Sequence, residues 1–350
     1  MKTVFKSELD NSDKLAVTKF AGEVDYFAIE QQIGFPELLY HSKITYFLLR
    51  DDEDSLKSFC QINENFKSAH IWFGPVCDDP DLMIESILRI VEYYKSMHFW
   101  YIGIQPYWKT GYDADYIEYY LNQKIKIDYI IDNENTKSSL EIDLHESIDA
   151  IFGKFSKGHK SAIKKAKKTG ITVLEASSAS EISSFQQVYL RMCQNRNIRA
   201  HTPGEIEGIS NYLSSHKLGT LLLAYSPENK ILGGAVFAYQ GVSVRYLLSA
   251  SDPDRRDLPI SHLIVYEAIE RAKLQQFKYF DFWGYNHFAL PTDQIYLVNR
   301  FKHGFGGYFT FLMKKMNISL IPHGFCLYKL YARAKKGLSL LKNIHRQRNY

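Results

Sequence analysis

Residues 244–283 read VRYLLSASDPDRRDLPISHLIVYEAIERAKLQQFKYFDFW, and this stretch decides the fold. An apolar run at 244–248 predicts a strand, and a second run at 279–283 predicts another. Between them, after a turn at Asp252-Pro253, apolar residues recur with helical spacing over about 260–275. A strand, a helix and a strand joined by short connections predict a layered α/β architecture.

The first half of the chain repeats this order. We expect a strand at 69–73, a turn at Asp79-Pro80, a helix at about 82–97 and a strand at 99–104. The same unit occurring twice predicts a duplicated domain packed against its copy. The length of 350 residues agrees with this, because single hydrophobic cores stop growing near ~250 residues.

The second domain is expected at about 145–310. A predicted strand leads into a basic helix at 148–168, which ends in a glycine suited to the left-handed position after a helix. The first domain then comprises residues 1–144 together with about 311–350. The chain is expected to return to it because residues 318–331 predict a strand and a helix that have no partner nearby.

Composition excludes several classes of protein. The hydrophobic fraction is 45% and the formal net charge is only +4, so the chain can bury a core and is not a general binder of polyanions. The four cysteines are scattered, which predicts neither a zinc site nor a disulfide framework. The sequence also lacks the phosphate-binding and dinucleotide-binding glycine loops, the nucleophile elbow and the HExxH metal helix.

The two ends of the chain give indications of where in the cell the protein is found. Residues 1–10 carry charges without an apolar signal core, and no run of about 18 apolar residues occurs, so we expect a cytoplasmic protein. Residues 327–350 mix leucines with lysines and arginines in the pattern of a cationic amphipathic helix. This helix is expected either to be solvated or to make peripheral contact with the inner face of an anionic membrane.

Three basic clusters could carry chemistry. Residues 154–168 place lysines around a sparse apolar seam, which fits either a phosphate-rich ligand or a solvated face. Residues 300–307, RFKHGFGG, combine positive charge, rings for stacking and flexible glycines, as in a loop that binds the end of a nucleotide or in an ordinary glycine-rich turn. Residues 194–199, QNRNIR, could present guanidinium groups to a diphosphate or simply end a surface helix.

Taken in order, these segments resemble the FemABX peptidoglycan interpeptide-bridge aminoacyltransferases, a branch of the acetyltransferase-like superfamily. The similarity spans nearly the whole chain and is carried by WFGPV (72–76), EIDL (141–144), IKKAKKTGI (163–171), Arg196, Tyr246 through Asp252, FDFWG (280–284), RFK (300–302) and FGG (305–307). No long helical-hairpin insertion occurs between residues 168 and 285 of the sequence, so the chain is most similar to the compact members.

The resemblance implies two tandem acetyltransferase-like domains with mixed sheets flanked by helices. It implies an aminoacyltransferase that moves an amino acid from aminoacyl-tRNA to an amine of a UDP-linked or lipid-linked muropeptide, without a metal or a cofactor. Lys302 and Phe301 would contact the aminoacyl end of the tRNA, Lys302 would stabilise the charge that develops as the amine attacks, and Arg196 would bind the acceptor's diphosphate. The other residues expected to bind substrate are Lys160, Tyr246, Asp281, Arg300 and Phe305.

Two other functions stay open. An acyl-CoA-dependent N-acyltransferase acting on an amino sugar or an amino acid would share the superfamily. However, residues 253–261 lack both glycines of the loop that binds the CoA pyrophosphate at a helix start. A non-catalytic RNA-binding or scaffold protein that has kept the fold is the third reading. Where the family commonly has Asp-Pro, this chain has Gln105-Pro106, so no carboxylate base is assigned there.

Overall fold

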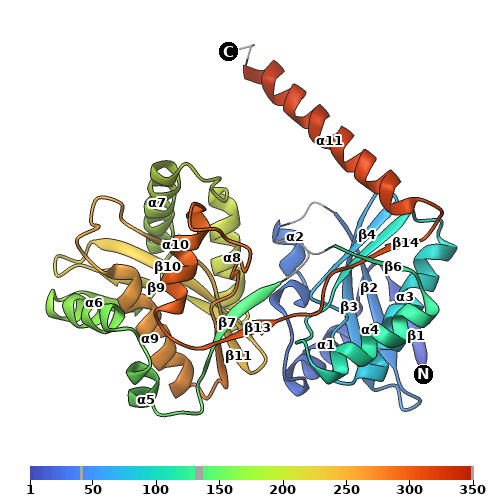
Figure 1. Cartoon of the computed structure of the whole chain (residues 1–350), viewed down its shortest axis with the longest axis horizontal. Helices are drawn as coiled ribbons and strands as arrows, with labels where there is room; N and C mark the ends of the chain where they lie inside the picture. The colour runs from blue at the N-terminus through green and yellow to red at the C-terminus, as the bar shows by residue number, and fades with distance from the viewer. Residues whose placement is uncertain (40–41, 131–136, 348–350) are drawn as a thin grey trace. The chain divides into compact units, whose positions relative to one another are not determined.

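The computed structural model describes residues 1–39, 42–130 and 137–347, and the side chains of all these except 39, 203 and 336–347. The chain forms two compact units (Figure 1), which comprise Met1–Val24, His41–Thr136 and Leu312–Tyr350 in the first, and Asp25–Tyr40 and Lys137–Phe311 in the second. Over the described ranges, each unit is built on a seven-stranded mixed sheet with helices around it. The expected fold class is confirmed.

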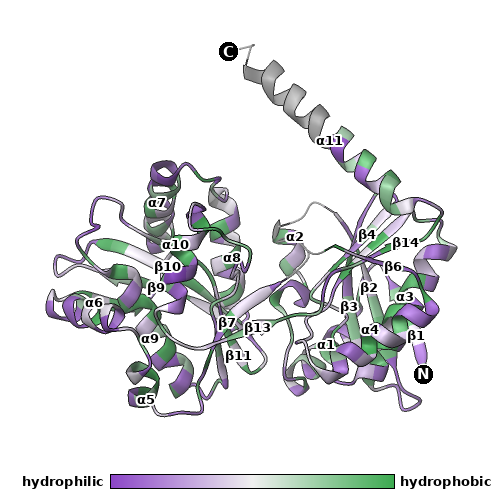
Figure 2. Ribbon diagram, viewed as in Figure 1, coloured by the Kyte–Doolittle hydropathy of each residue, from purple (hydrophilic) through white to green (hydrophobic). Residues whose placement is uncertain are grey.

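The first unit has the strand order β1-β2-β3-β4-β5-β14-β6. Its strands are β1 Lys2–Lys6, β2 Lys43–Arg50, β3 Leu56–Asn65, β4 Ser68–Trp72, β5 Tyr101–Gln105, β6 Ile127–Tyr129 and β14 Met316–Ser319. Its helices are α1 Asn11–Glu23, α3 Pro80–Ser96, α4 Tyr112–Lys124 and α11 Gly324–Gln347. Figure 2 shows apolar residues along the central strands. Met83, Ile87 and Ile90 of α3 pack against them in one core, as their helical spacing requires.

The second unit has the strand order β13-β7-β12-β11-β10-β9-β8. Its strands are β7 Ser138–Asp143, β8 Thr172–Glu175, β9 Gly219–Tyr225, β10 Ile231–Gln240, β11 Ser243–Ser251, β12 Tyr279–Asp281 and β13 Tyr308–Phe311. Its helices are η1 Ile29–Gln31, α2 Phe35–Leu39, α5 Ile148–Gly153, α6 Lys157–Lys168, α7 Ala179–Arg196, α8 Pro203–Ser215, α9 Ile260–Leu274 and α10 Gln294–His303. Along β10, Phe237 joins the core that contains α9 and Val236 joins the core that contains α7. Helices therefore cover both faces of this sheet.

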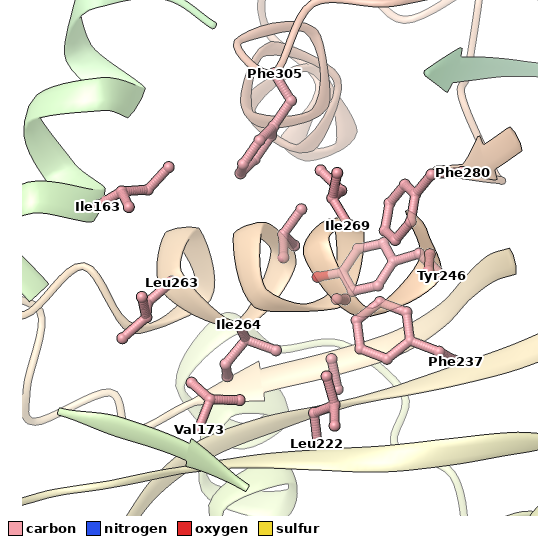
Figure 3. Packing of buried hydrophobic residues seen from close by; sticks show 14 of the residues in the cluster. Ile163, Val173, Leu222, Phe237, Tyr246, Leu263, Ile264, Ile269, Phe280 and Phe305 are labelled. Carbon is pink, nitrogen blue, oxygen red and sulfur yellow. The ribbon is translucent and has the colours of Figure 1, made fainter. Parts of the chain in front are cut away.

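The apolar residues that recur with helical spacing along α9 are buried in one core (Figure 3). Leu263, Ile264 and Ile269 are each at most 1% exposed and share a cluster with Phe237 and Phe280. Burying a side chain of this size stabilises the fold by roughly 1.5–3 kcal/mol. The periodic residues of α9 thus fix the helix on the sheet.

The repeated strand–helix–strand unit is present in both halves, as β4-α3-β5 and β11-α9-β12. In each copy the two strands are parallel neighbours, whereas the remaining ladders among the described strands are antiparallel. In the first copy the expected turn at Asp79-Pro80 is the start of the helix itself. The Asp79 carboxylate accepts the backbone N–H groups of Asp81 and Leu82, and Pro80 occupies the first turn.

The domain boundary expected near residue 144 is wrong. Strand β7, assigned to the first domain, lies between β12 and β13 in the second sheet. Its residues are buried almost throughout, so it needs neighbours on both edges. Residues 25–39 also belong to the second unit, where Ile29 enters the core of α7 and α8. The C-terminal segment does return to the first unit, because β14 lies between β5 and β6.

The single basic helix expected at 148–168 is also wrong, since α5 ends at Gly153 and α6 begins at Lys157. Ser156 interrupts the helix because its hydroxyl caps α6 by accepting the backbone N–H of His159 at 3.2 Å. The backbone N–H of Ser156 donates to the Gly304 carbonyl at 2.8 Å. The break therefore ties the start of α6 to the turn that follows α10.

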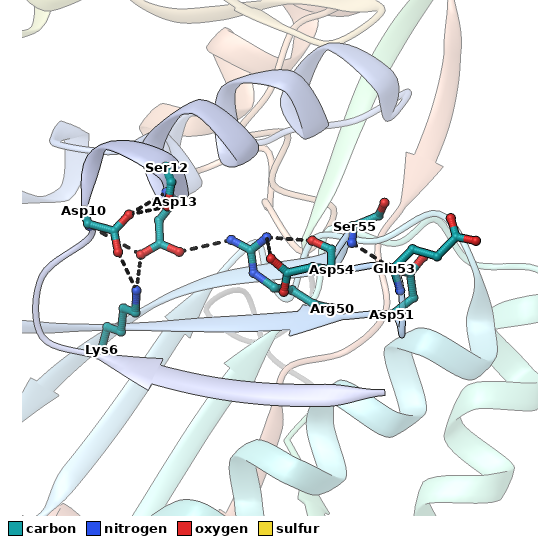
Figure 4. A network of polar contacts seen from close by, with 9 residues as sticks. All are labelled: Lys6, Asp10, Ser12, Asp13, Arg50, Asp51, Glu53, Asp54 and Ser55. Atoms are coloured by element: carbon teal, nitrogen blue, oxygen red, sulfur yellow. Dashed lines mark hydrogen bonds and ion pairs between the residues drawn. The ribbon is translucent and has the colours of Figure 1, made fainter.

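A buried carboxylate joins β1, α1 and β2 in the first unit (Figure 4). Asp13 is 4% exposed and accepts hydrogen bonds from Lys6 and from Arg50, the latter at 3.0 Å. Its side chain also accepts the backbone N–H of Asp10 and completes a capping box at the start of α1. The buried charge is tolerated because both of its oxygens are paired.

Helix α11 is anchored by stacked rings. Phe325 and Tyr328 stack on Tyr101 with centroid separations of 5.0 and 4.4 Å. The amphipathic helix expected at 327–350 is helical as far as Gln347, but its side chains from residue 336 on lie outside the described ones. Contact with a membrane stays a prediction. None of the helices in the described ranges combines the length and the apolar content of a membrane span.

The turn between β10 and β11 gives a test of how residues 25–39 are attached. Gly241 has φ +56°, and a Cβ there would lie 2.2 Å from the Asp25 carbonyl oxygen. We expect Gly241→Ala to lower the free energy of unfolding by about 1–3 kcal/mol, because both the backbone conformation and the contact become strained. Urea unfolding measures this. Gly204→Ala is the control, because no atom lies within 4 Å of its added Cβ, and an equal loss in both variants would contradict the prediction.

Candidate functional site

Helix α10 carries the lysine expected to be catalytic. Residues 300–303, expected in a loop, form its last turn, and only the glycine-containing segment after it is a turn. Lys302 is 6% exposed, and its Nζ donates hydrogen bonds to the carbonyls of Trp283 and Gly284, the latter at 3.1 Å. An ammonium has three donors, and no further hydrogen bond from Nζ occurs within the described ranges. One N–H of Lys302 therefore remains for a ligand.

The charge of Lys302 is held in a dry environment. Burial lowers the pKa of its ammonium to about 8, while the nearby Asp281 carboxylate acts in the opposite direction. The ammonium therefore still predominates at pH 7. A hydrogen bond from it to a developing negative charge is worth more here than it would be in water.

Two consecutive left-handed residues present the carbonyls to Lys302. Trp283 has φ 47° and Gly284 has φ 55°. Glycine adopts this region freely, whereas a bulky residue is strained by roughly 1–3 kcal/mol and stays there only if its surroundings fix it. The backbone N–H of Trp283 donates to Asp281 at 2.8 Å, and the Ser139 hydroxyl donates to the same oxygen. Asp281 therefore holds the backbone of the strained residue.

The ring of Trp283 lies against a fully buried arginine. The side chain of Arg245 is 0% exposed, its guanidinium carbon lies 3.8 Å from the ring centroid, and its Nε lies 3.8 Å from Asp281. Its Nη1 donates to both carboxylate oxygens of Glu30 at 3.1 Å. Sequence reasoning missed Glu30, Arg245 and Trp283 as site residues. A charged residue inside the apolar run 244–248 was the available signal for Arg245, but no local pattern links it to Glu30.

The two phenylalanines expected to contact ligand lie in different surroundings. Phe305 is 1% exposed and packs against Phe155 and Phe282, so it does not provide the expected stacking surface. Phe301 is half-buried, and its ring centroid lies 5.0 Å from that of His262. Burial lowers the pKa of His262 to about 4, and neighbouring His159 adds to the lowering, so His262 is neutral at pH 7.

Rings that are exposed or half-buried lie instead around Phe309, which is 41% exposed. The centroids of Tyr285, His303 and His287 lie 5.0, 5.9 and 6.0 Å from that of Phe309. We call these four residues the exposed ring cluster. In sequence, His303 follows Lys302 and Tyr285 follows Gly284, whose carbonyl accepts a hydrogen bond from Lys302.

Two residues expected to bind substrate, Tyr246 on β11 and Arg196 at the end of α7, are near enough to interact electrostatically. Tyr246 is 8% exposed and donates to the hydroxyl of Ser249. Burial raises the pKa of Tyr246 to about 12, and the charge of Arg196 partly opposes this rise. Tyr246 lies just beyond the point where β11 and β12 part, because their ladder ends at Arg245. Arg196 is exposed at the end of α7, which Asn197 terminates in a left-handed conformation.

The remaining expected residues are less constrained. Lys160 donates from Nζ to the Gly153 carbonyl at 2.9 Å, and Arg300 is exposed on α10. In the first unit, Gln105 is fully buried and its Nε2 donates to the Met313 carbonyl at 2.8 Å. An amide does not titrate, so this position offers no general base.

This architecture matches solved structures. The crystal structure of FemX superimposes with a TM-score of 0.76, covering 94% of this chain and 99% of FemX at 16% sequence identity. The chain has the FemX fold. The resemblance to FemABX proteins deduced from the sequence is thereby confirmed at the level of the fold.

Two further solved structures have a similar fold. The C-terminal domain of a putative lysylphosphatidylglycerol synthetase from Agrobacterium fabrum gives a TM-score of 0.57 at 10% identity, covering 91% of this chain and 95% of that domain. A tandem GNAT protein from the clavulanic acid biosynthesis pathway gives 0.52 at 8% identity, covering 92% and 99%. No protein-family model and no curated protein sequence matches the chain. The FemX-like assignment therefore rests on three-dimensional structure.

The buried ammonium predicts a pH dependence of stability. The pKa of Lys302 is about 8 in the folded chain and near 10.5 when unfolded, so the unfolded state binds more protons between these values. Stability must then rise with pH in this window relative to Lys302→Met. We expect the difference in unfolding free energy to grow by about 2 kcal/mol from pH 8 to 9.5. Urea unfolding of both proteins at several pH values measures it, and a flat or falling difference would contradict the burial of the charge.

Proposed function

We propose that the chain is an aminoacyltransferase that moves an amino acid from aminoacyl-tRNA to an amine of a cell-wall peptide precursor. The observation that carries this proposal is the buried ammonium of Lys302, which is held by two carbonyls and keeps one N–H for a ligand. The FemX fold and the resemblance of residues 280–307 to FemABX aminoacyltransferases support it.

The reaction needs one centre of positive charge. The acceptor amine attacks the ester carbonyl carbon of the aminoacyl-tRNA, a C–N bond forms, and negative charge passes through the carbonyl oxygen. The C–O bond to the ribose then breaks, the amine loses a proton and the ribose oxygen gains one. The remaining N–H of Lys302 would donate to the oxyanion, a contribution of about 3–4 kcal/mol for a well-placed donor. Phe301, one residue before it, would flank the aminoacyl group.

The exposed ring cluster supports RNA as the donor. Stacking of an unpaired base on a ring is worth ~1–3 kcal/mol and tolerates any sequence, as the shared end of different tRNAs requires. Arg300 and the lysines of α6, Lys160 among them, would add contacts to phosphates. In this proposal the stacking surface is Phe309 and its neighbours in place of the buried Phe305.

The acceptor would bind near Arg196, whose exposed guanidinium suits a diphosphate. A CoA donor is the alternative, since a tandem GNAT protein shares the fold. Helix α9 starts where CoA pyrophosphate would be expected, but the glycine loop that would bind it is missing. The missing loop favours the tRNA donor.

A transfer assay tests the proposal directly. Radiolabelled amino acids on a pool of charged tRNAs are offered with UDP-linked and with lipid-linked muramyl peptides, in parallel with labelled acetyl-CoA and amino-sugar acceptors. We expect label on the peptide, and we expect ribonuclease treatment of the tRNA to abolish it. Label transferred from acetyl-CoA alone would contradict the proposal that aminoacyl-tRNA is the donor.

Lys302 is the residue to change. We expect Lys302→Ala to lower kcat by about 10²–10³-fold, because the oxyanion loses its donor. For the wild type, kcat should decline as pH rises through about 8, where the ammonium loses its proton. Lys14→Ala, an exposed change on α1, is the matched control. Circular dichroism must show both variants folded, and a folded Lys302→Ala protein with wild-type kcat would favour a non-catalytic role for this site.

A further inference from the structure

Arg245 is a fully buried charge whose partner lies far away in sequence. Glu30, separated from it by 215 positions, supplies both carboxylate oxygens to its Nη1. Glu30 belongs to η1, where the neighbouring Ile29 is fully buried. An apolar pair of similar volume usually stabilises a core as well as a buried ion pair does, so the pair calls for a reason other than stability.

The contact between Arg245 and Trp283 suggests a role for the ion pair other than stability. The guanidinium of Arg245 lies over the ring of Trp283, the residue with the strained backbone. The Trp283 carbonyl in turn accepts a hydrogen bond from Lys302. A guanidinium can clamp a ring only if its plane is fixed, and the carboxylate of Glu30 fixes it from the far end. Contacts thus run without interruption from Glu30 to the ammonium of Lys302.

We propose that Glu30, Arg245 and Trp283 are positioning residues that aim the Nζ of Lys302 by holding Trp283 in its left-handed conformation. The proposal rests on the function proposed above for Lys302. Asp281 fixes the backbone N–H of Trp283, and Arg245 fixes its ring. With the ring released, Trp283 relaxes toward an ordinary conformation, its carbonyl turns away, and Lys302 loses one of its two hydrogen-bond acceptors.

The substitution Glu30→Gln tests this series of contacts and changes the shape of the side chain least. The wild-type and variant proteins, in full length, are treated with an amine-reactive acylating reagent over a range of pH, and mass spectrometry follows the labelling of Lys302. We expect the pH midpoint of labelling to rise in the variant, because a released Lys302 becomes more solvated and Asp281 still faces it. We also expect kcat for the transfer to fall about tenfold with KM unchanged.

The substitution Arg245→Lys separates positioning from charge. It keeps the positive charge beside Glu30 but removes the planar face that clamps Trp283. We expect it to lower kcat as Glu30→Gln does, and wild-type kcat in Arg245→Lys would overturn the clamp. The double variant Glu30→Gln/Arg245→Gln controls for misfolding of the single variants. Removal of both charges leaves no unpaired buried charge, so it restores the stability of the fold without restoring the clamp on Trp283. Its kcat should therefore stay low, and recovery of kcat together with stability would show a merely structural role.

Asp25→Asn is the matched control for Glu30→Gln. Asp25 also lies in residues 25–39 and also pairs with a basic residue, Lys278 at 3.2 Å, but this pair is exposed. We expect wild-type labelling of Lys302 and wild-type kcat in this variant. If Glu30→Gln behaves like Asp25→Asn in both measurements, the positioning proposal fails.

Labelling of Lys302 needs no turnover, which keeps this proposal separate from the proposed function. If Glu30→Gln shifts the labelling midpoint but the wild type transfers nothing from charged tRNA, the positioning proposal stands and the aminoacyltransferase proposal fails. If the wild type transfers an amino acid but Glu30→Gln changes neither the midpoint nor kcat, the aminoacyltransferase proposal stands and the positioning proposal fails.

Discussion

The positive charge of Arg245 has to be neutralised where no water reaches it, and much of the second unit is arranged around this requirement. An unpaired buried charge costs several kcal/mol, so its partners must be close and fixed. Glu30 comes from residues 25–39, Asp281 comes from the neighbouring strand, and Trp283 adds the face of its ring. Residues 25–39 belong to the second unit, and β11 and β12 are parallel neighbours, so the fold brings these partners to Arg245.

The two copies of the repeated unit use the same scaffold differently. In each copy the parallel ladder begins with a serine opposite a tyrosine. Two positions later the first copy pairs His70 with Gly103, while the second pairs Arg245 with Asp281. Burial lowers the pKa of His70 to about 4, so that position is neutral at pH 7. The charged pair at this register therefore occurs in the second copy, where the ladder ends at Arg245 and Asp281.

Sequence patterns predicted most of the scaffold and only part of the site. Helix α9 was predictable because its buried apolar residues recur at helical spacing and belong to one core. Helix α10 was not, because Leu297 on it is 65% exposed and the glycines after it dominate the pattern. The boundary at β7 was misplaced because a strand buried on both faces gives no sign of which sheet it joins. Phe305 was expected at a surface because composition alone does not distinguish a ring that stacks on ligand from a ring that fills a core.

By itself, the sequence determined the α/β class, the duplication, and the order of the strands and helices around the repeat. These properties are local, since hydrophobic periodicity and glycine placement act over a few residues. The tertiary structure alone decided which charges meet: Glu30 with Arg245, and Lys302 with the carbonyls of Trp283 and Gly284. Pairing across 215 positions depends on which elements the fold places side by side, and no local pattern encodes it.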